Sequence, residues 1–133
     1  MGRYSFSGHE TFHCRSFWLK KGFDYAKSSD AGFDDSAVVE LGVGRNMVGS
    51  IRYWLRAFGL FEHNDATSNF AELVFRDDGF DPYLEDIGTL WLLHYHLVKS
   101  ENTASLYSLL FNGLRKVRPE FSKNHFISMV LEK

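Results

Sequence analysis

The sequence predicts a mainly α-helical fold with a small β-hairpin, in which a winged helix-turn-helix-like domain at residues 1–80 is followed by packed helices at 81–133. Residues 35–58 show the spacing of two amphipathic helices separated by the turn Gly42-Val43-Gly44. Residues 60–76 then show a strand, a loop and a strand, which is the position of a wing. The rest of the chain carries apolar residues at helical spacing up to its end.

The second helix of this motif, from Arg45 to about Phe58, has two different sides. On one of them Arg45, Arg52 and Arg56 fall within about 40° of one another on a helical wheel. Like charges one or two turns apart repel, so this row favours an anionic partner such as a phosphate backbone. A solvated surface and a protein-binding helix are the alternatives. The other side is expected to face the core and comprises Met47, Val48, Ile51, Trp54, Leu55 and Phe58.

The winged-helix interpretation predicts that this second helix enters the major groove of duplex DNA while the wing lies along the backbone. Lys20 and Lys21, on an amphipathic helix expected at residues 16–27, are further candidates for phosphate contacts, although such a pair is more often simply solvated. The wing has no lysine or arginine before Arg76, so we do not expect it to hold DNA strongly. The candidate DNA-binding residues of the second helix are Arg45, Asn46, Ser50, Arg52, Tyr53 and Arg56.

Composition and charge limit the classes of function. A single cysteine, Cys14, excludes an internal disulfide, and the chain opens without a basic and apolar leader, so we expect a cytoplasmic protein. The net charge of -2 is unevenly divided, because residues 61–101 hold two Lys/Arg against nine Asp/Glu while both flanking segments are basic. DNA would therefore be bound through a patch, with the acidic segment facing away or facing a protein partner.

The longest apolar run, Thr89 to Val98, has about half the length that a bilayer requires. It is apolar nearly all round, so we expect a buried core helix and not a membrane span. Two histidines in it, His94 and His96, point to different faces and are not expected to share a metal. Asn102 or Thr103 is the expected cap of the next helix.

Residues 9–13 match the pattern H-E-x-x-H, which on a helix binds zinc through two histidines and uses the glutamate as general base. Gly8, directly before the pattern, argues against a helix there. A polar loop in which His9 and Glu10 bond the backbone or each other is favoured, and a functional site without metal is the alternative. His9 and Glu10 are thus weak catalytic candidates, and no metal or other cofactor is expected.

The acidic run at residues 76–86 also resembles a metal site at first sight. The residue order of a calcium loop is absent, however, and Asp86 stands where the following helix needs an N-cap. Capping is therefore the favoured interpretation. Ser122 is the expected cap of a last helix, and the apolar pattern of that helix continues to the final residues, which predicts a longer polypeptide.

Several segments resemble the domain-of-unknown-function family four-thousand-and-seven. They are Phe6–Phe12, Trp18–Lys21, Leu41–Val48, Ser50–Trp54, Asp81–Asp86 and Thr89–His94. Genes of that family lie beside phosphoadenosine-phosphosulfate-reductase-like ATPases in bacterial DNA phosphorothioation and phage-defence loci, and Ssp-type members are described as DNA-nicking components. The resemblance thus implies double-stranded DNA as a partner. It also leaves two alternatives: an adaptor for the reductase-like ATPase, or part of a DNA-nicking enzyme.

Overall fold

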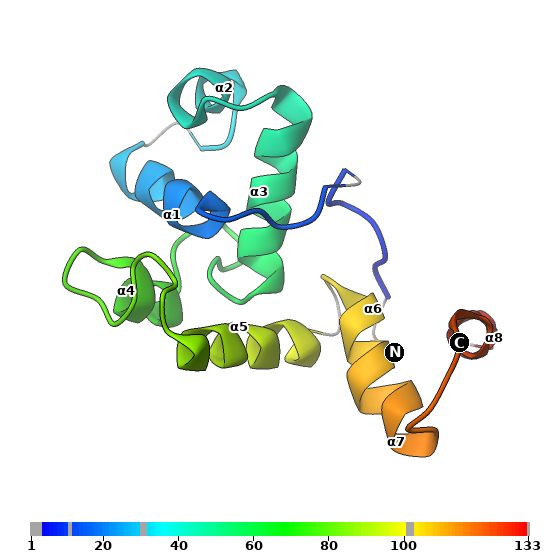
Figure 1. Ribbon diagram of the computed structural model, residues 1–133. Helices are drawn as coiled ribbons and strands as arrows, with labels where there is room; N and C mark the ends of the chain where they lie inside the picture. The colour runs from blue at the N-terminus through cyan, green and yellow to red at the C-terminus, as the bar shows by residue number, and fades with distance from the viewer. Residues whose placement is uncertain (1–3, 11, 30–31, 101–102, 133) are drawn as a thin grey trace.

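The computed structural model describes residues 4–10, 12–29, 32–100 and 103–132, and the regular structure in these ranges is helical (Figure 1). Residues 11, 30–31 and 101–102 separate the described ranges. The helices are α1 Trp18–Ser28, α2 Asp35–Leu41, α3 Arg45–Ala57, α4 Asn69–Phe75, α5 Ile87–Lys99, α6 Ser105–Ser108, the π-helical turn η1 Leu109–Leu114, α7 Arg115–Val117 and α8 Lys123–Leu131. The mainly α prediction is therefore confirmed.

Helices α1, α2 and α3 pack against one another, with α3 crossing beside α1 (Figure 1). Gly22 of α1 lies at this crossing, because a Cβ atom there would meet Ile51 Cγ2 at 2.8 Å and the side chain of Leu55. The apolar side predicted for α3 is buried at Val48, Ile51, Trp54 and Leu55. The same core includes Leu93 and Leu97 of α5. The proposed division at residue 80 stays a prediction.

The two helices predicted on either side of the glycine turn are confirmed. Asp34 caps α2, since its carboxylate accepts a hydrogen bond from the backbone N–H of Ser36. The chain leaves α2 through Gly42, whose φ is +67°, and α3 begins at Arg45. The end of α3 is followed by Gly59 with φ +71°, as expected of a helix stop.

The winged helix-turn-helix prediction is wrong, because residues 60–76 do not form a β-hairpin. Among the described residues, the pairing at this place is an isolated antiparallel bridge between Phe61 and Thr67. Asn69–Phe75 is helix α4, whose N-cap Ser68 accepts a hydrogen bond from Ala71 N at 3.1 Å. Ala71, Val74 and Phe75 face the core. Their spacing of three and four residues is helical, which the apparent strand pattern concealed.

The prediction that α5 is buried nearly all round is also wrong. Its inner side is buried at Thr89, Leu93 and Leu97, whereas the outer side leaves Trp91 67% exposed. The predicted cap is confirmed, because Asp86 accepts a hydrogen bond from Gly88 N at 2.7 Å. The other exposed apolar side chains of this helix are Ile87, Leu90, Leu92 and Tyr95.

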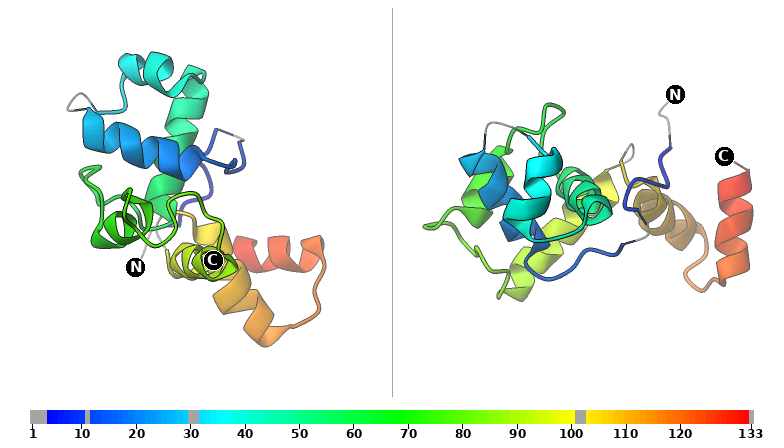
Figure 2. Two further views of the ribbon diagram at one scale, coloured as in Figure 1. Left: turned by 60° about the vertical axis from the view of Figure 1, so that its left-hand side comes forward. Right: turned by 90° about the horizontal axis from the view of Figure 1, so that it is seen from above.

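The C-terminal helices lie beside the N-terminal segment. Ser5 and Ser105 exchange two hydrogen bonds: Ser5 N donates to Ser105 Oγ at 2.6 Å and Ser105 N donates to Ser5 O at 3.0 Å. The N-cap of α6 is Ala104 and not Thr103, while Asn102 lies outside the described residues. The cap of α8 by Ser122 is confirmed. Figure 2 shows α8 at the end of the molecule away from α1 and α2.

Candidate functional site

A hollow of about 790 Å³ lies along α3 and is the candidate site. One wall is α3 itself, with Gly49, Arg52, Tyr53 and Arg56. The N-terminal segment passes across α3 (Figure 1) and supplies Ser5, Ser7 and Gly8. The loop after α3 closes the opposite side with Phe61, Glu62, His63 and Asn64, and Thr103 completes the lining. We call this hollow the α3 groove.

Two of the predicted DNA-binding arginines meet in the α3 groove, and both are bound to one carboxylate. Arg52 donates to Asp65 Oδ2 through Nε and Nη2, each at 2.7 Å. Arg56 donates to Asp65 Oδ1 through Nε at 2.8 Å and Nη2 at 2.7 Å. One carboxylate thus serves two guanidinium groups, and this part of the site keeps a formal charge of +1.

The loop that carries Asp65 is closed by its own backbone. Glu62 N donates to Ala66 O at 2.8 Å, and Asp65 N donates to Glu62 O at 3.0 Å. Asn64 supports the same turn, because its side-chain oxygen accepts from Ala66 N at 3.1 Å. Asp65 itself has φ +61°, a left-handed conformation that aspartate adopts more readily than most residues. The backbone therefore directs this carboxylate at α3.

The third arginine of the predicted row lies apart from this pair. Arg45, in the first turn of α3, is exposed and donates to Asp35 Oδ1 of α2 at 2.6 Å. Asn46 beside it is also exposed. Because both partners of the Arg45–Asp35 pair are open to water, a ligand could replace this carboxylate at little cost.

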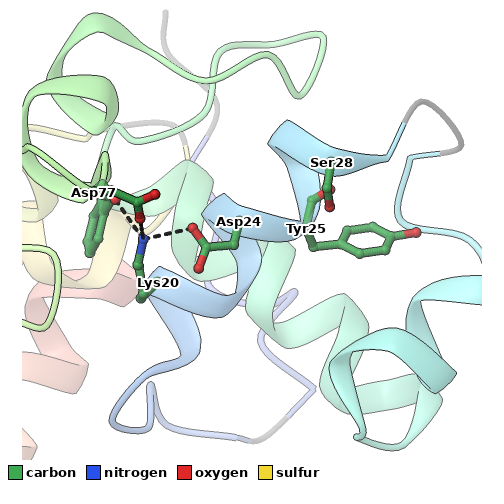
Figure 3. Close-up of polar contacts among 6 residues, drawn as sticks. Lys20, Asp24, Tyr25, Ser28 and Asp77 are labelled. Atoms are coloured by element: carbon green, nitrogen blue, oxygen red, sulfur yellow. Dashed lines mark hydrogen bonds and ion pairs between the residues drawn. The ribbon is translucent and has the colours of Figure 1, made fainter.

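Two other predicted contact residues are buried and cannot touch DNA in this conformation. Ser50 is fully buried on the inner side of α3. Lys20 is buried as well, and its Nζ donates to Phe75 O and to Asp24 Oδ1, both at 2.8 Å. Figure 3 shows this ammonium group between Asp24 and Asp77. The sequence prediction failed for Lys20 because the end of α4, which needs a donor, lies 55 residues away.

Lys21 is exposed but also has a structural partner. Its Nζ donates to Leu41 O at 3.2 Å, at the C-terminal end of α2. A cation at this end of a helix offsets the negative end of the dipole. Lys21 therefore remains reachable by phosphate, outside the lining of the α3 groove.

The segment around His9 packs against Tyr53 and Trp54 of α3. A Cβ atom at Gly8 would lie 2.8 Å from Tyr53 Cδ2, and its φ is +121°, so only glycine suits this position. The His9 ring stacks on Trp54, with ring centroids 6.0 Å apart, and meets Tyr53 edge-on. His9 and Glu10 lie in a turn and not in a helix, so the zinc geometry of H-E-x-x-H is not formed.

A smaller hollow of about 220 Å³ adjoins the α3 groove and shares Ser5 and Tyr53 with it. Burial raises the pKa of Tyr53 to about 12, with Tyr107 as a second cause. Burial also raises the pKa of the Cys14 thiol to about 12. These groups keep their protons at neutral pH, so neither is an activated nucleophile. In the described part of the chain, no three His, Cys, Asp or Glu side chains gather closely enough to hold a metal ion.

Sequence reasoning missed Asp65 and the loop from Glu62 to Asn64. The winged-helix prediction places these residues in and beside the loop between its two strands and gives them no contact with the second helix. The available signal was the arginine row itself, since repelling charges on a helix call for a nearby anion. The winged-helix prediction supplies this anion as a phosphate of DNA, whereas in the structure the carboxylate of Asp65 supplies it.

Fold and groove together define an all-helical domain with a partly neutralised cationic groove, within the residues described. The chain belongs to the family described as Protein of unknown function (DUF4007), whose sequence profile matches residues 6–133. The Ssp-type resemblance is supported by two solved structures, an SspB crystal structure and a magnesium-ion-bound SspB crystal structure.

The chain is 41% identical to the first of these, with a TM-score of 0.62 over 72% of this chain and 32% of that one. It is 38% identical to the second, with a TM-score of 0.70 over 83% of this chain and 37% of that one. The chain thus spans about a third of the solved SspB chains. No curated protein sequence matches it. Within the described ranges, no helix is long and apolar enough to cross a membrane.

Proposed function

We propose that this chain is a component of a bacterial DNA phosphorothioation or phage-defence system of the Ssp type, and that it binds duplex DNA through the α3 groove. The similarity to SspB at 41% and 38% identity carries the first part of this proposal. The two arginines that meet in the groove support the second part, because guanidinium groups bind phosphate oxygens in pairs.

The charge and the exposure of the arginines in the groove suit a sugar-phosphate backbone. Arg52 and Arg56 are one helical turn apart, and both are partly exposed. Gly49 adds no side chain to the wall, so a backbone can approach α3 closely. Arg45 and Asn46 are exposed further along the same helix and provide further contacts. The binding mode therefore requires no wing.

A salt titration of a labelled duplex tests this function. Each phosphate that the protein neutralises steepens the fall of log affinity with log salt by about 0.9. Arg52→Ala and Arg56→Ala are each expected to weaken binding and to flatten this dependence. Arg76→Ala is the matched control, because Arg76 is exposed at the end of α4 and pairs with Asp78 away from the groove. Equal affinity of all three variants and the parent protein would contradict the proposal.

The second candidate function is an adaptor for a phosphoadenosine-phosphosulfate-reductase-like ATPase. Two features favour it. The outer side of α5 is apolar and exposed, as protein-binding surfaces often are. The acidic residues Asp77, Asp78 and Glu85 precede this helix and suit a basic partner. Titration of the purified ATPase with the chain measures this interaction. Trp91→Gln is expected to weaken it while leaving DNA affinity unchanged, and an unaltered ATPase affinity in that variant would reject this surface.

A further inference from the structure

The two guanidinium groups in the α3 groove are held as they would be by a phosphate. Each oxygen of the Asp65 carboxylate accepts two N–H groups from one arginine, at 2.7–2.8 Å. A phosphodiester presents two non-bridging oxygens and one negative charge, as the carboxylate does. The pair Arg52 and Arg56 therefore has one position for an anion, and Asp65 fills it.

We propose that Asp65 is a built-in competitor of DNA phosphate, which occupies the arginine pair in the free protein and is displaced when DNA binds. This inference rests on the proposed function of the α3 groove. The exchange leaves the charge of the occupied pair unchanged, because one anion replaces another. A ligand with a single negative charge therefore gains little binding free energy from the exchange. DNA competes better, because its closely spaced phosphates offer many anions at high local density.

Three features allow the carboxylate to leave. The site is open to water, since the side chains of Asp65, Arg52 and Arg56 are 20%, 42% and 35% exposed. The loop keeps its closure without the side chain, because Glu62 N, Asp65 N and Ala66 N bond within the loop. The left-handed backbone of Asp65 is one that aspartate tolerates, so the loop does not need the arginine bonds to keep its conformation.

Asp65→Asn is the first test, because it removes the charge and keeps the size of the side chain. At one salt concentration it is expected to bind a labelled duplex roughly three- to tenfold more tightly, as expected from the loss of two partly exposed ion pairs. Its salt dependence is expected to be steeper, because the freed arginines now release counterions from DNA.

Glu62→Gln is the matched control. It removes the same charge from the same loop and the same groove, and among the described residues the Glu62 carboxylate forms no ion pair. A general relief of repulsion would make both variants bind equally well. Displacement from the arginine pair predicts a gain for Asp65→Asn that is at least threefold larger and that disappears when Arg52→Ala is added.

Asp65→Gly keeps the inference testable if the asparagine variant folds poorly, since glycine accepts φ +61° without strain. It is expected to show the same gain in affinity. If neither the parent protein nor any variant binds the duplex at low salt, the proposed function fails and this inference fails with it. If the parent binds and Arg52→Ala weakens binding, but the Asp65 variants match Glu62→Gln, only the competitor role is overturned.

Discussion

The ammonium group of Lys20 lies 2.8 Å from the carbonyl oxygen of Phe75, below the surface of the molecule. This bond joins α1 to the last residue of α4, where helix carbonyls have no partner inside the helix. The Lys20 ammonium also bonds Asp24, one turn further along α1. Lys20, which the sequence analysis names as a candidate for phosphate contacts, thus joins α1 to α4.

Replacement of Lys20 is therefore expected to destabilise the fold. Lys20→Met keeps the length of the side chain but leaves the carbonyl of Phe75 without its donor, so a loss of about 1–3 kcal/mol in the free energy of unfolding is expected. Chemical denaturation followed by circular dichroism measures it. Lys27→Met is the control, because Lys27 forms an exposed ion pair with Glu72 and should lose at most about 1 kcal/mol. Equal losses in the two variants would contradict a structural role for Lys20.

Local patterns predicted the helices but not their partners. The apolar side of α3 and the caps at Asp86 and Ser122 depend on residues a few positions apart, and they were predicted correctly. The bonds of Lys20 to Phe75 and of Arg52 to Asp65 join residues 55 and 13 positions apart. Spacing along the chain does not determine such contacts. The sequence-based prediction therefore found no partner within the protein for Lys20 and Arg52, and it assigned both to DNA.

Segment 69–75 shows a different cause of error. Phe70, Val74 and Phe75 favour a strand by residue type, whereas Ser68 is a preferred N-cap residue and Glu72 places an acidic group in the first turn of a helix. The structure resolves the conflict in favour of the cap, since Ser68 Oγ accepts from Ala71 N and donates to Gly59 O at 2.8 Å. The bonds of Ser68 and the burial of Ala71, Val74 and Phe75 on one side therefore favour a helix over a strand, and the second strand of the predicted wing does not form.

Two glycines inside helices are expected to respond to alanine with opposite signs. Gly22→Ala introduces a Cβ against Ile51 and Leu55, which are fully buried and cannot move aside, so a loss of about 1–3 kcal/mol is expected. Gly49→Ala meets only Glu10 Cγ, at 4.0 Å, and should gain about 0.5–1 kcal/mol from helix propensity. Thermal or chemical unfolding of both variants checks this contrast, and a shared sign would refute the crossing at Gly22.

The pH dependence of stability is expected to involve His96. Its ring stacks on Phe70 at 4.2 Å, and burial lowers its pKa below the ordinary 6.5, with the charge of Lys99 as a second cause. The unfolded chain therefore takes up a proton first as the pH falls. Stability is fully present above about pH 6.5 and decreases as the pH falls towards the lower pKa of the folded state.

His96→Phe keeps a ring against Phe70 and cannot titrate, so its stability curve should be flatter below pH 6.5. The free energy of unfolding, measured by urea denaturation at several pH values, tests this expectation. Phe70→Leu serves as the comparison, because it weakens the stack at every pH but retains the histidine. An unchanged slope in His96→Phe would show that another group causes the loss of stability.

The outer side of α5 is expected to contribute little to folding although it is apolar. Trp91 is 67% exposed, so Trp91→Gln should change the free energy of unfolding by no more than about 0.5 kcal/mol. Leu93, two residues along the same helix, is 3% exposed, and Leu93→Ala should cost about 2–5 kcal/mol through the cavity it leaves. Hydrophobicity is similar at the two positions, so packing alone separates them. A large loss in Trp91→Gln would place that side chain in a core and restore the all-round burial that the sequence predicted.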